Sequence, residues 1–277
     1  MVHLRLIGGV FILLNKRTDF KKQAVKHQLK QFLYPLLSFV AVMLIWEWIV
    51  HQFHLSLYIL PAPSDIIIAL LDNAKVLWTH SMVTLSEACI GLSLAALLAF
   101  VIAIVMDMSN ICKKSLYPHL VVTQTVPVMI LGPLFAIWFG FGMTPKIIMV
   151  IFMCFFPIVI SFHDAMAKAD KQQLMLLKSF QAKRWQLYRY IKIPSAANAF
   201  FSGLKVAATY CIGGAIVGEW LSASAGLGYY MIRVKNGYML DKVFACVVVI
   251  ILWSLLLHFC VVWMEKLILP YQRKRRK

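Results

Sequence analysis

The chain has 277 residues, of which 61% are hydrophobic and 14% are charged, and its formal net charge is +17. Soluble domains contain roughly 45–50% apolar and about 25% charged residues, so this composition excludes an ordinary soluble protein and indicates a chain that faces lipid. The basic residues gather in a few segments between apolar runs, which favours orientation in a bilayer over binding to nucleic acid.

The first segment, residues 1–31, is basic and is predicted to be cytoplasmic. Its apolar run Ile7–Leu14 is too short to cross a membrane. A signal peptide carries its positive charge before the apolar run, whereas Lys16 and Arg17 follow it here, so we do not expect one. Two interpretations of this run stay open: an interfacial helix, or an extended start upstream of the true one.

Six apolar stretches are long enough, or nearly so, to cross about 30 Å of hydrocarbon at about 1.5 Å per helical residue. They are Phe32–Val50, Val83–Met106, Leu116–Phe139, Ile147–Phe162, Ala196–Leu221 and Val243–Met264. The third contains Pro127 and Pro133, which predict a kink or a break. We therefore expect an all-α integral membrane protein of about six transmembrane helices, with residues 32–267 as its transmembrane domain.

Two segments between these stretches contain residues that are typical of turns. Leu60–Asp65 is predicted to form a turn in which Ser64 caps a short helix that contains Ile66–Leu71. Gly226, Leu227 and Gly228 are predicted to form a tight turn that sends Tyr229–Tyr238 back along the outer surface.

The distribution of positive charge predicts the orientation. Most of the 28 Lys and Arg residues lie before the first stretch, in the loop after the fourth stretch and in the tail 268–277. Because positive residues stay on the cytoplasmic side, we expect both termini and that loop in the cytosol. The opposite side has few basic residues, and Lys146 is assigned to a loop there.

The most informative loop is 164–194. When it is read as helix, apolar residues recur at three-residue steps, in the sets Leu174, Leu177, Phe180 and Trp185, Tyr188, Ile191. This spacing predicts two short amphipathic helices, with a break near Gln181 and Ala182 and an end at Pro194. Adsorption to anionic lipid is one alternative. Docking of a cytosolic partner is favoured, because the apolar set is compact and aromatic.

The run from Asp170 to Pro194 resembles the coupling loop, or EAA loop, of binding-protein-dependent ABC permeases. Further stretches fit the same family in the right order: Leu60–Ser64, Pro127–Gly142, Gly203–Ala207, Gly218–Leu221 and Gly226–Gly228. The similarity extends over roughly residues 30–270. It implies the type I ABC importer permease fold, called MetI-like, with a cytoplasmic coupling-helix loop.

The resemblance also implies which residues couple to an ATPase. They are Asp170, Leu174, Leu177, Lys178, Phe180, Gln181, Ala182, Arg184, Trp185 and Tyr188. The chain departs from the family pattern at Met175–Leu177, where Glu-Ala-Ala is usual, and at Gln181, where Gly is usual. A positive φ at Gln181 would carry a steric cost that Gly avoids.

The resemblance further implies a set of partners. Two copies of a separate ATPase would bind ATP and Mg, an external solute-binding protein would deliver the solute, and the permease would work as a homodimer or with a related subunit in a bacterial cytoplasmic membrane. The sequence has no G-x-x-x-x-G-K-[ST] motif, so the ATP chemistry is assigned to the partner. We expect no catalytic residue, metal or cofactor on this chain: its cysteines are scattered without C-x-x-C spacing, and no carboxylate or thiol completes a metal site with His51 and His54.

Ionisable and small residues inside the apolar stretches are candidates for the translocation pathway. They are Glu87, Lys205, Tyr210, Gly214, Gly218 and Glu219. Alternatives stay open for some of them. Lys205 could extend to the cytosolic face or form a buried pair. The small residues at four-residue spacing, which include Ala95, Ala99 and Ala103, could serve static helix packing.

The segment from Gly218 to Ala245 most resembles permeases for the hydroxymethylpyrimidine precursor of thiamine. A sulfonate, nitrate or riboflavin importer is the alternative within the family. A secondary transporter would need coupling carboxylates at mid-membrane or inverted repeats. A membrane enzyme would need a cluster of nucleophile, base or metal ligands at one face. The sequence shows neither pattern.

Overall fold

The computed structural model describes residues 33–222 and 224–270, and within these ranges every regular element is a helix. The basic segment predicted at 1–31 and most of the tail predicted at 268–277 lie outside the described residues. The chain divides into two compact units, one ending at Ile66 and the other beginning at Ile67. The two units are described separately.

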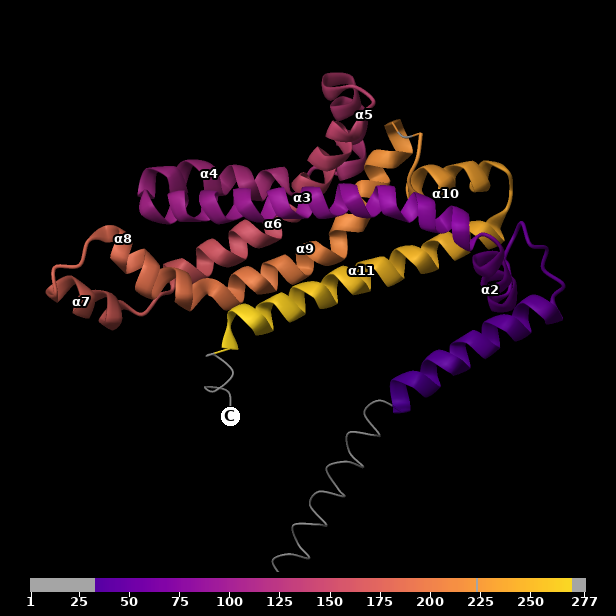
Figure 1. Cartoon of the computed structure of the whole chain (residues 1–277), viewed down its shortest axis with the longest axis horizontal. Coiled ribbons are helices and arrows are strands. Elements are labelled where there is room, and N and C mark those ends of the chain that lie inside the picture. Colours follow the sequence, from indigo (N-terminus) through magenta and orange to yellow (C-terminus); the bar gives the residue numbers. More distant parts are fainter. Residues whose placement is uncertain (1–32, 223, 271–277) are drawn as a thin grey trace, which may run out of the picture. The chain divides into compact units, whose positions relative to one another are not determined.

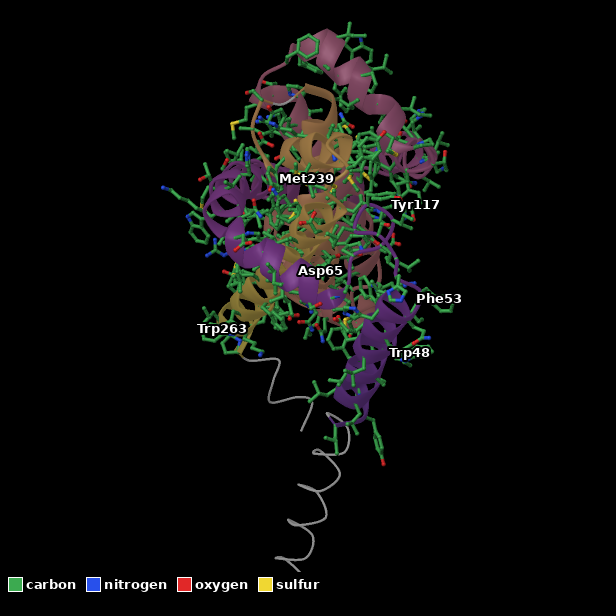
Figure 2. All side chains as sticks on the ribbon, turned by 90° about the vertical axis from the view of Figure 1, so that its right-hand side faces the viewer. Trp48, Phe53, Asp65, Tyr117, Met239 and Trp263 are labelled. Atoms are coloured by element: carbon green, nitrogen blue, oxygen red, sulfur yellow. The ribbon has the colours of Figure 1, made fainter. Side chains whose placement is uncertain are left out.

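The first unit contains the helix Leu33–Gln52 and the start of α2, Pro63–Asp72. Trp48 points outward from the first helix, as expected for a span that faces lipid (Figure 2). The prediction that Ser64 caps α2 is wrong. Pro63 occupies the first turn, where its missing N–H costs nothing, and Ser64 lies inside the helix and donates its hydroxyl to Glu47 at 2.7 Å.

The second unit is built on four long helices: α3 (Ala74–Met108), α6 (Met143–Ala167), α9 (Ile193–Ser222) and α11 (Leu240–Ile268). The helices α3, α6 and α11 all pack against α9 (Figure 1). The described residues include five helices long and apolar enough to cross a membrane, or six if one bent pair counts as a span. The prediction of about six spans is therefore confirmed.

Small residues let these helices approach one another closely. Ala95, Ala99 and Ala103 of α3 are all fully buried. A Cβ added at Gly203 of α9 would lie 2.6 Å from the carbonyl oxygen of Pro157 in α6. Backbones in such contact leave no room for a side chain. The small residues at four-residue spacing therefore serve helix packing.

The third predicted stretch is broken, as its prolines predict. Its two parts are α4 (Asn110–Thr123) and α5 (Val128–Phe139), which meet at 105°. The break falls at Pro127, directly before α5, whereas Pro133 lies inside α5 without ending it. In Figure 1, α5 stands away from the direction shared by α3, α6 and α9.

The short helices mark the two ends of the four-helix bundle. In Figure 1, α7 (Lys171–Ser179) and α8 (Arg184–Leu187) lie at one end, and α10 (Leu227–Asn236) lies at the other. The predicted tight turn is confirmed only at its first residue, Gly226, whose φ of 114° favours glycine, whereas Leu227 and Gly228 already lie in α10.

Candidate functional site

The loop predicted to couple to an ATPase begins with α7. Asp170 caps this helix, because its Oδ1 accepts a hydrogen bond from the Gln172 N–H at 2.8 Å. The helix ends in a Schellman motif, in which the Ala182 N–H donates to the Leu177 carbonyl at 3.2 Å and the Gln181 N–H donates to the Lys178 carbonyl at 2.9 Å. The predicted break near Gln181 and Ala182 is confirmed.

Gln181 makes this bend with a left-handed backbone. Its φ is 58°, which places a Cβ where the family pattern has Gly. A left-handed residue other than Gly carries a penalty of about 1 kcal/mol or more. Gln181, in place of the usual Gly, therefore carries the steric cost of a positive φ that the sequence predicts.

The exposed apolar surface of the loop differs from the predicted face. Leu174 and Leu177 are half-buried, whereas Phe180 is 76% and Trp185 is 54% exposed. Two exposed residues that the three-residue spacing missed are Met175 and Leu176. Met175, Leu176, Phe180 and Trp185, which we propose as a docking surface, are large apolar side chains that water solvates poorly.

The second helix of the loop continues into the membrane-spanning helix. The helix α8 is followed by the π-helical turn η1 (Tyr188–Lys192) and then by α9, so one helical run extends from Arg184 to Leu221. The predicted end at Pro194 is wrong. The Ile193 N–H donates five residues back to the Tyr188 carbonyl, and this change of hydrogen-bond register places Pro194 in a first turn of α9, where a missing N–H is tolerated.

A buried carboxylate ties this turn to α3. Asp107, near the cytoplasmic end predicted for α3, accepts hydrogen bonds through Oδ2 from the Tyr188 hydroxyl at 2.7 Å and from the Lys192 ammonium. The side chain of Asp107 is almost fully buried. The sequence reasoning missed both Asp107 and Lys192, because 81 residues separate Asp107 from Tyr188.

Two of the predicted pathway residues form a polar cluster near the opposite end of the bundle. Glu87 of α3 is 1% exposed and its Oε1 pairs with the Lys146 ammonium of α6 at 2.8 Å. The assignment of Lys146 to an outer loop is wrong, because Lys146 lies in the first turns of α6 and is buried. A buried ammonium needs a partner of opposite charge, which Glu87 supplies.

Glu219 holds three elements together in the same cluster. It is 1% exposed, and its Oε1 accepts from the Thr84 hydroxyl of α3 at 2.6 Å. Its Oε2 accepts from the Gly228 N–H of α10. A Cβ at Gly226 would overlap the Glu219 carboxyl group, so the glycine also gives this carboxylate its space. The arrangement fixes the start of α10 against α3 and α9.

The other predicted pathway residues lie in different surroundings. Gly214 and Gly218 face α6, where a Cβ at Gly218 would lie 2.9 Å from the Lys146 Cα. Lys205 pairs with Glu265 of α11 at 3.0 Å, which agrees with the paired alternative for it. Tyr210 is 52% exposed on α9. Of the six residues, Tyr210 has by far the largest open surface.

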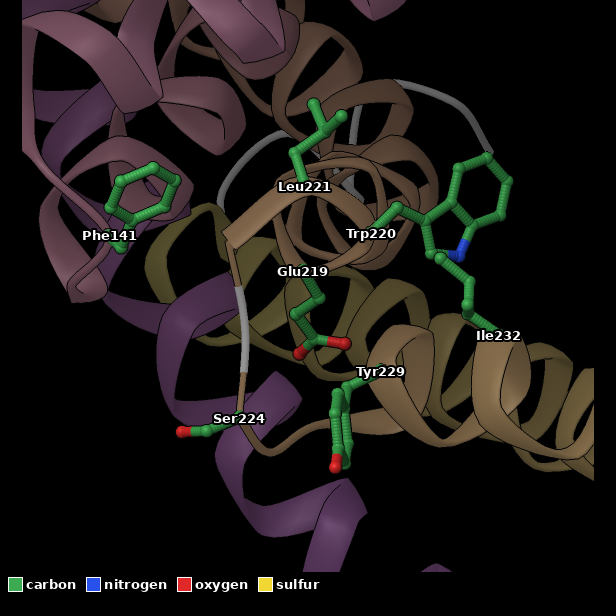
Figure 3. A pocket seen from close by; sticks show the side chains of 7 residues that line it. All are labelled: Phe141, Glu219, Trp220, Leu221, Ser224, Tyr229 and Ile232. Atoms are coloured by element: carbon green, nitrogen blue, oxygen red, sulfur yellow. The ribbon is translucent and has the colours of Figure 1, made fainter. Parts of the chain in front are cut away.

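A pocket of about 440 Å³ lies beside Glu219 at the end of α9. Figure 3 shows its aromatic side chains Phe141, Trp220 and Tyr229 around the last turn of the helix. Both Glu219 oxygens already accept hydrogen bonds from Thr84 and Gly228. The pocket therefore adjoins a satisfied structural carboxylate rather than a free one.

Within residues 33–222 and 224–270, no group of three His, Cys, Asp or Glu side chains could hold a metal ion. The described residues show contacts that join helices to one another. An exposed apolar patch stands at one end, a continuous helix joins it to the bundle, and buried polar contacts fasten the helices to one another.

Comparisons with known proteins agree with this arrangement. A family model described as "Binding-protein-dependent transport system inner membrane component" matches residues 91–274. A probable ABC transporter permease protein of Haemophilus influenzae is 34% identical, over 84% of this chain and 96% of its own length. The formylaminopyrimidine transport permease protein ThiX of Halalkalibacterium halodurans is 32% identical, over 88% and 98% respectively.

Among solved structures, the fold is similar to that of a chain in the inward-facing MetNI methionine ABC transporter. The TM-score is 0.58 at 14% identity, and the match covers 70% of this chain and 94% of that one. At this identity the likeness supports the fold alone.

Proposed function

The chain belongs to the binding-protein-dependent transport system inner membrane components and is the membrane-spanning permease subunit of an ABC importer, and from this premise we propose that it conducts a small aminopyrimidine of the thiamine-precursor type. One observation carries the choice of solute. The formylaminopyrimidine permease is 32% identical to this chain, whereas a riboflavin permease is 27% identical and a taurine permease is 24% identical.

The proposed mechanism transmits force through the α8–α9 helical run. The docking surface would sit in a groove of the ATPase, where Phe180 and Trp185 would bury apolar area that is now exposed. Closure of two ATPase copies would then move α8. Because α8 continues through η1 into α9, and Asp107 fastens η1 to α3, the displacement reaches two transmembrane helices directly.

We assign the partners by the ends of the bundle. The α7–α8 end faces the cytosol and binds two ATPase copies, which carry ATP and Mg. The α10 end faces a solute-binding protein, and both termini are cytoplasmic. A second copy of the permease covers the exposed apolar face of α5, which includes Met129, Ile130, Ile137 and Trp138.

The translocation pathway in this proposal follows the open side of α9. Val206, Thr209 and Tyr210 are all exposed on this helix, whereas its other sides are buried against α3, α6 and α11. Glu87, Gly214, Gly218 and Glu219 then hold the helices that frame the pathway, as their contacts support.

Reconstitution tests the proposal. The permease, its ATPase and its binding protein are placed in proteoliposomes, and uptake of labelled formylaminopyrimidine is compared with uptake of taurine. We expect ATP-dependent uptake of the pyrimidine only when the binding protein is present. Uptake of taurine alone would overturn the assigned solute, and pyrimidine uptake without the ATPase would overturn the mechanism.

A further inference from the structure

A cavity of about 400 Å³ lies where the third span is broken. Its lining comes from three places: the connection between α4 and α5, which contributes Gln124; the middle of α6, which contributes Phe152 and Phe156; and the middle of α9, which contributes Tyr210. This volume is in the range of about 300–1,000 Å³ typical of small-molecule sites.

This cavity lies deep in the bundle, unlike the pocket beside Glu219 at the end of α9. Phe152 and Phe156 lie near the centre of α6, and Tyr210 lies near the centre of α9. Irregular backbone at such depth is tolerated only where protein covers it or where it borders a water-filled cavity. Binding sites of membrane transporters lie beside interrupted helices for the same reason.

Two polar side chains in this cavity lack good partners. The Gln124 carboxamide makes one long hydrogen bond, from Nε2 to the Leu120 carbonyl at 3.5 Å. The Tyr210 hydroxyl makes none to another residue in the described ranges. Polar groups at membrane depth face lipid only at a high cost, so these two favour a polar partner that the cavity can admit.

We propose that this cavity is the solute site of the permease, with Gln124 and Tyr210 hydrogen-bonding a planar nitrogen heterocycle that packs against Phe152 and Phe156. The proposal rests on the proposed function for the kind of solute, and adds which residues recognise it. It explains why the polar groups lie at the break, where the interrupted helix opens space that a straight helix would fill.

The chemistry of the lining matches an aminopyrimidine. A glutamine carboxamide presents a donor and an acceptor in one plane, and pairs with an amino group beside a ring nitrogen, as glutamine does with adenine. Phe152 and Phe156 are edge to face, with ring centroids 5.2 Å apart and an interplanar angle of 83°. One of the two rings can therefore offer its face, and the other its edge, to a flat solute.

The test compares two solutes in proteoliposomes that contain the whole importer. One is labelled formylaminopyrimidine, and the other is the same ring with its amino group replaced by hydrogen. The measured quantity is the ratio of their uptake efficiencies. The same binding protein delivers both solutes, so its own preference cancels when a variant is compared with the wild type.

We expect Gln124→Leu to lower this ratio about tenfold, because a lost hydrogen bond to the amino group penalises only the solute that carries it. Tyr210→Phe, which keeps the ring, should lower pyrimidine uptake about fivefold. The matched control is Ser93→Ala, near the middle of α3 and outside the cavity, whose hydroxyl bonds to the Cys89 carbonyl of its own helix and whose loss should leave both values unchanged. Both cavity residues are exposed, so the variants should assemble, and ATP hydrolysis by the complex reports this.

The outcomes separate the two proposals. If wild-type protein takes up the pyrimidine, while Gln124→Leu and Tyr210→Phe both keep wild-type ratio and uptake, the cavity assignment is wrong and the proposed function stands. If wild-type protein takes up no pyrimidine, both proposals are overturned.

Discussion

The ion pair between Lys146 and Glu87 shows how much two side chains can stabilise the packing of membrane-spanning helices. Their ion pair, at 2.8 Å, joins α6 to α3, and both side chains are buried. Removal of one partner leaves the other charge without compensation, which costs about 3–5 kcal/mol for a buried pair. We expect Lys146→Met to lower the thermal unfolding temperature of the purified permease by several degrees.

The control for this prediction is a second substitution. Glu87→Gln combined with Lys146→Met removes both charges and should recover most of the lost stability, because buried pairs are often replaceable by uncharged groups. Lys235→Met, at an exposed position on α10, should have no effect. Wild-type stability of Lys146→Met would show that the ion pair is not structural.

For Gln181 we predict a substitution that increases stability, whereas Lys146→Met lowers it. Its φ of 58° is strained for any residue with a Cβ, so Gln181→Gly should stabilise the bend between α7 and α8 by about 1 kcal/mol. The measurement is hydrogen exchange of the backbone amides of residues 179–183, which should become slower. Ser179→Gly, two residues earlier at the end of α7, should make exchange faster, because glycine weakens a helix. Equal effects of the two glycines would contradict the strain argument.

At the scale of elements, we propose that the loop 164–194 binds the ATPase through one set of residues and transmits its movement through another. Phe180→Asp or Trp185→Asp places a charge in the docking surface and should release the ATPase, so that transport is lost while the permease stays inserted. Copurification with the ATPase and uptake measure the two effects. Gln173→Asp, at an exposed polar position on α7, serves as the control. Wild-type coupling in both aspartate variants would mean that the interface lies elsewhere.

Asp107→Asn should produce a different defect. The amide weakens the contact with Lys192 and Tyr188 but leaves the docking surface unchanged. We expect the ATPase to remain bound and to hydrolyse ATP, while transport per ATP falls several-fold. Loss of ATPase binding in this variant would show that Asp107 shapes the loop and does not transmit its movement.

The elements themselves could largely be predicted from the sequence. Hydropathy predicted the spans, Pro127 predicted the break, and the three-residue spacing of apolar residues predicted α7 and α8. The same spacing missed Met175 and Leu176, because a short helix does not show which side faces the protein. Pro194 misled the prediction because the π-helical turn before it is a matter of backbone register, which composition does not encode.

For the molecule as a whole, the sequence could not predict the polar contacts. Glu219 and Thr84 lie 135 residues apart, and no local period relates them. In the sequence, Lys146 resembles a loop residue because its charge directly precedes the apolar stretch Ile147–Phe162. Long-range pairs of this kind depend on how α3, α6, α9 and α10 meet, and a single sequence does not contain that information.

The arrangement of the bundle predicts which side of the membrane each end faces. The helices α7 and α10 lie at opposite ends of α3, α6 and α9 (Figure 1), so a membrane must separate them. Cysteines introduced at Gln173 in α7 and at Asn236 in α10, both exposed, can be labelled with an impermeant maleimide. We expect Asn236→Cys to react in intact cells and Gln173→Cys to react only in inverted vesicles. The wild-type protein, whose Cys260 is exposed in α11, gives the background. Labelling of both positions from one side would contradict the arrangement, and reversed labelling would place the docking surface outside the cell, where no ATPase could reach it.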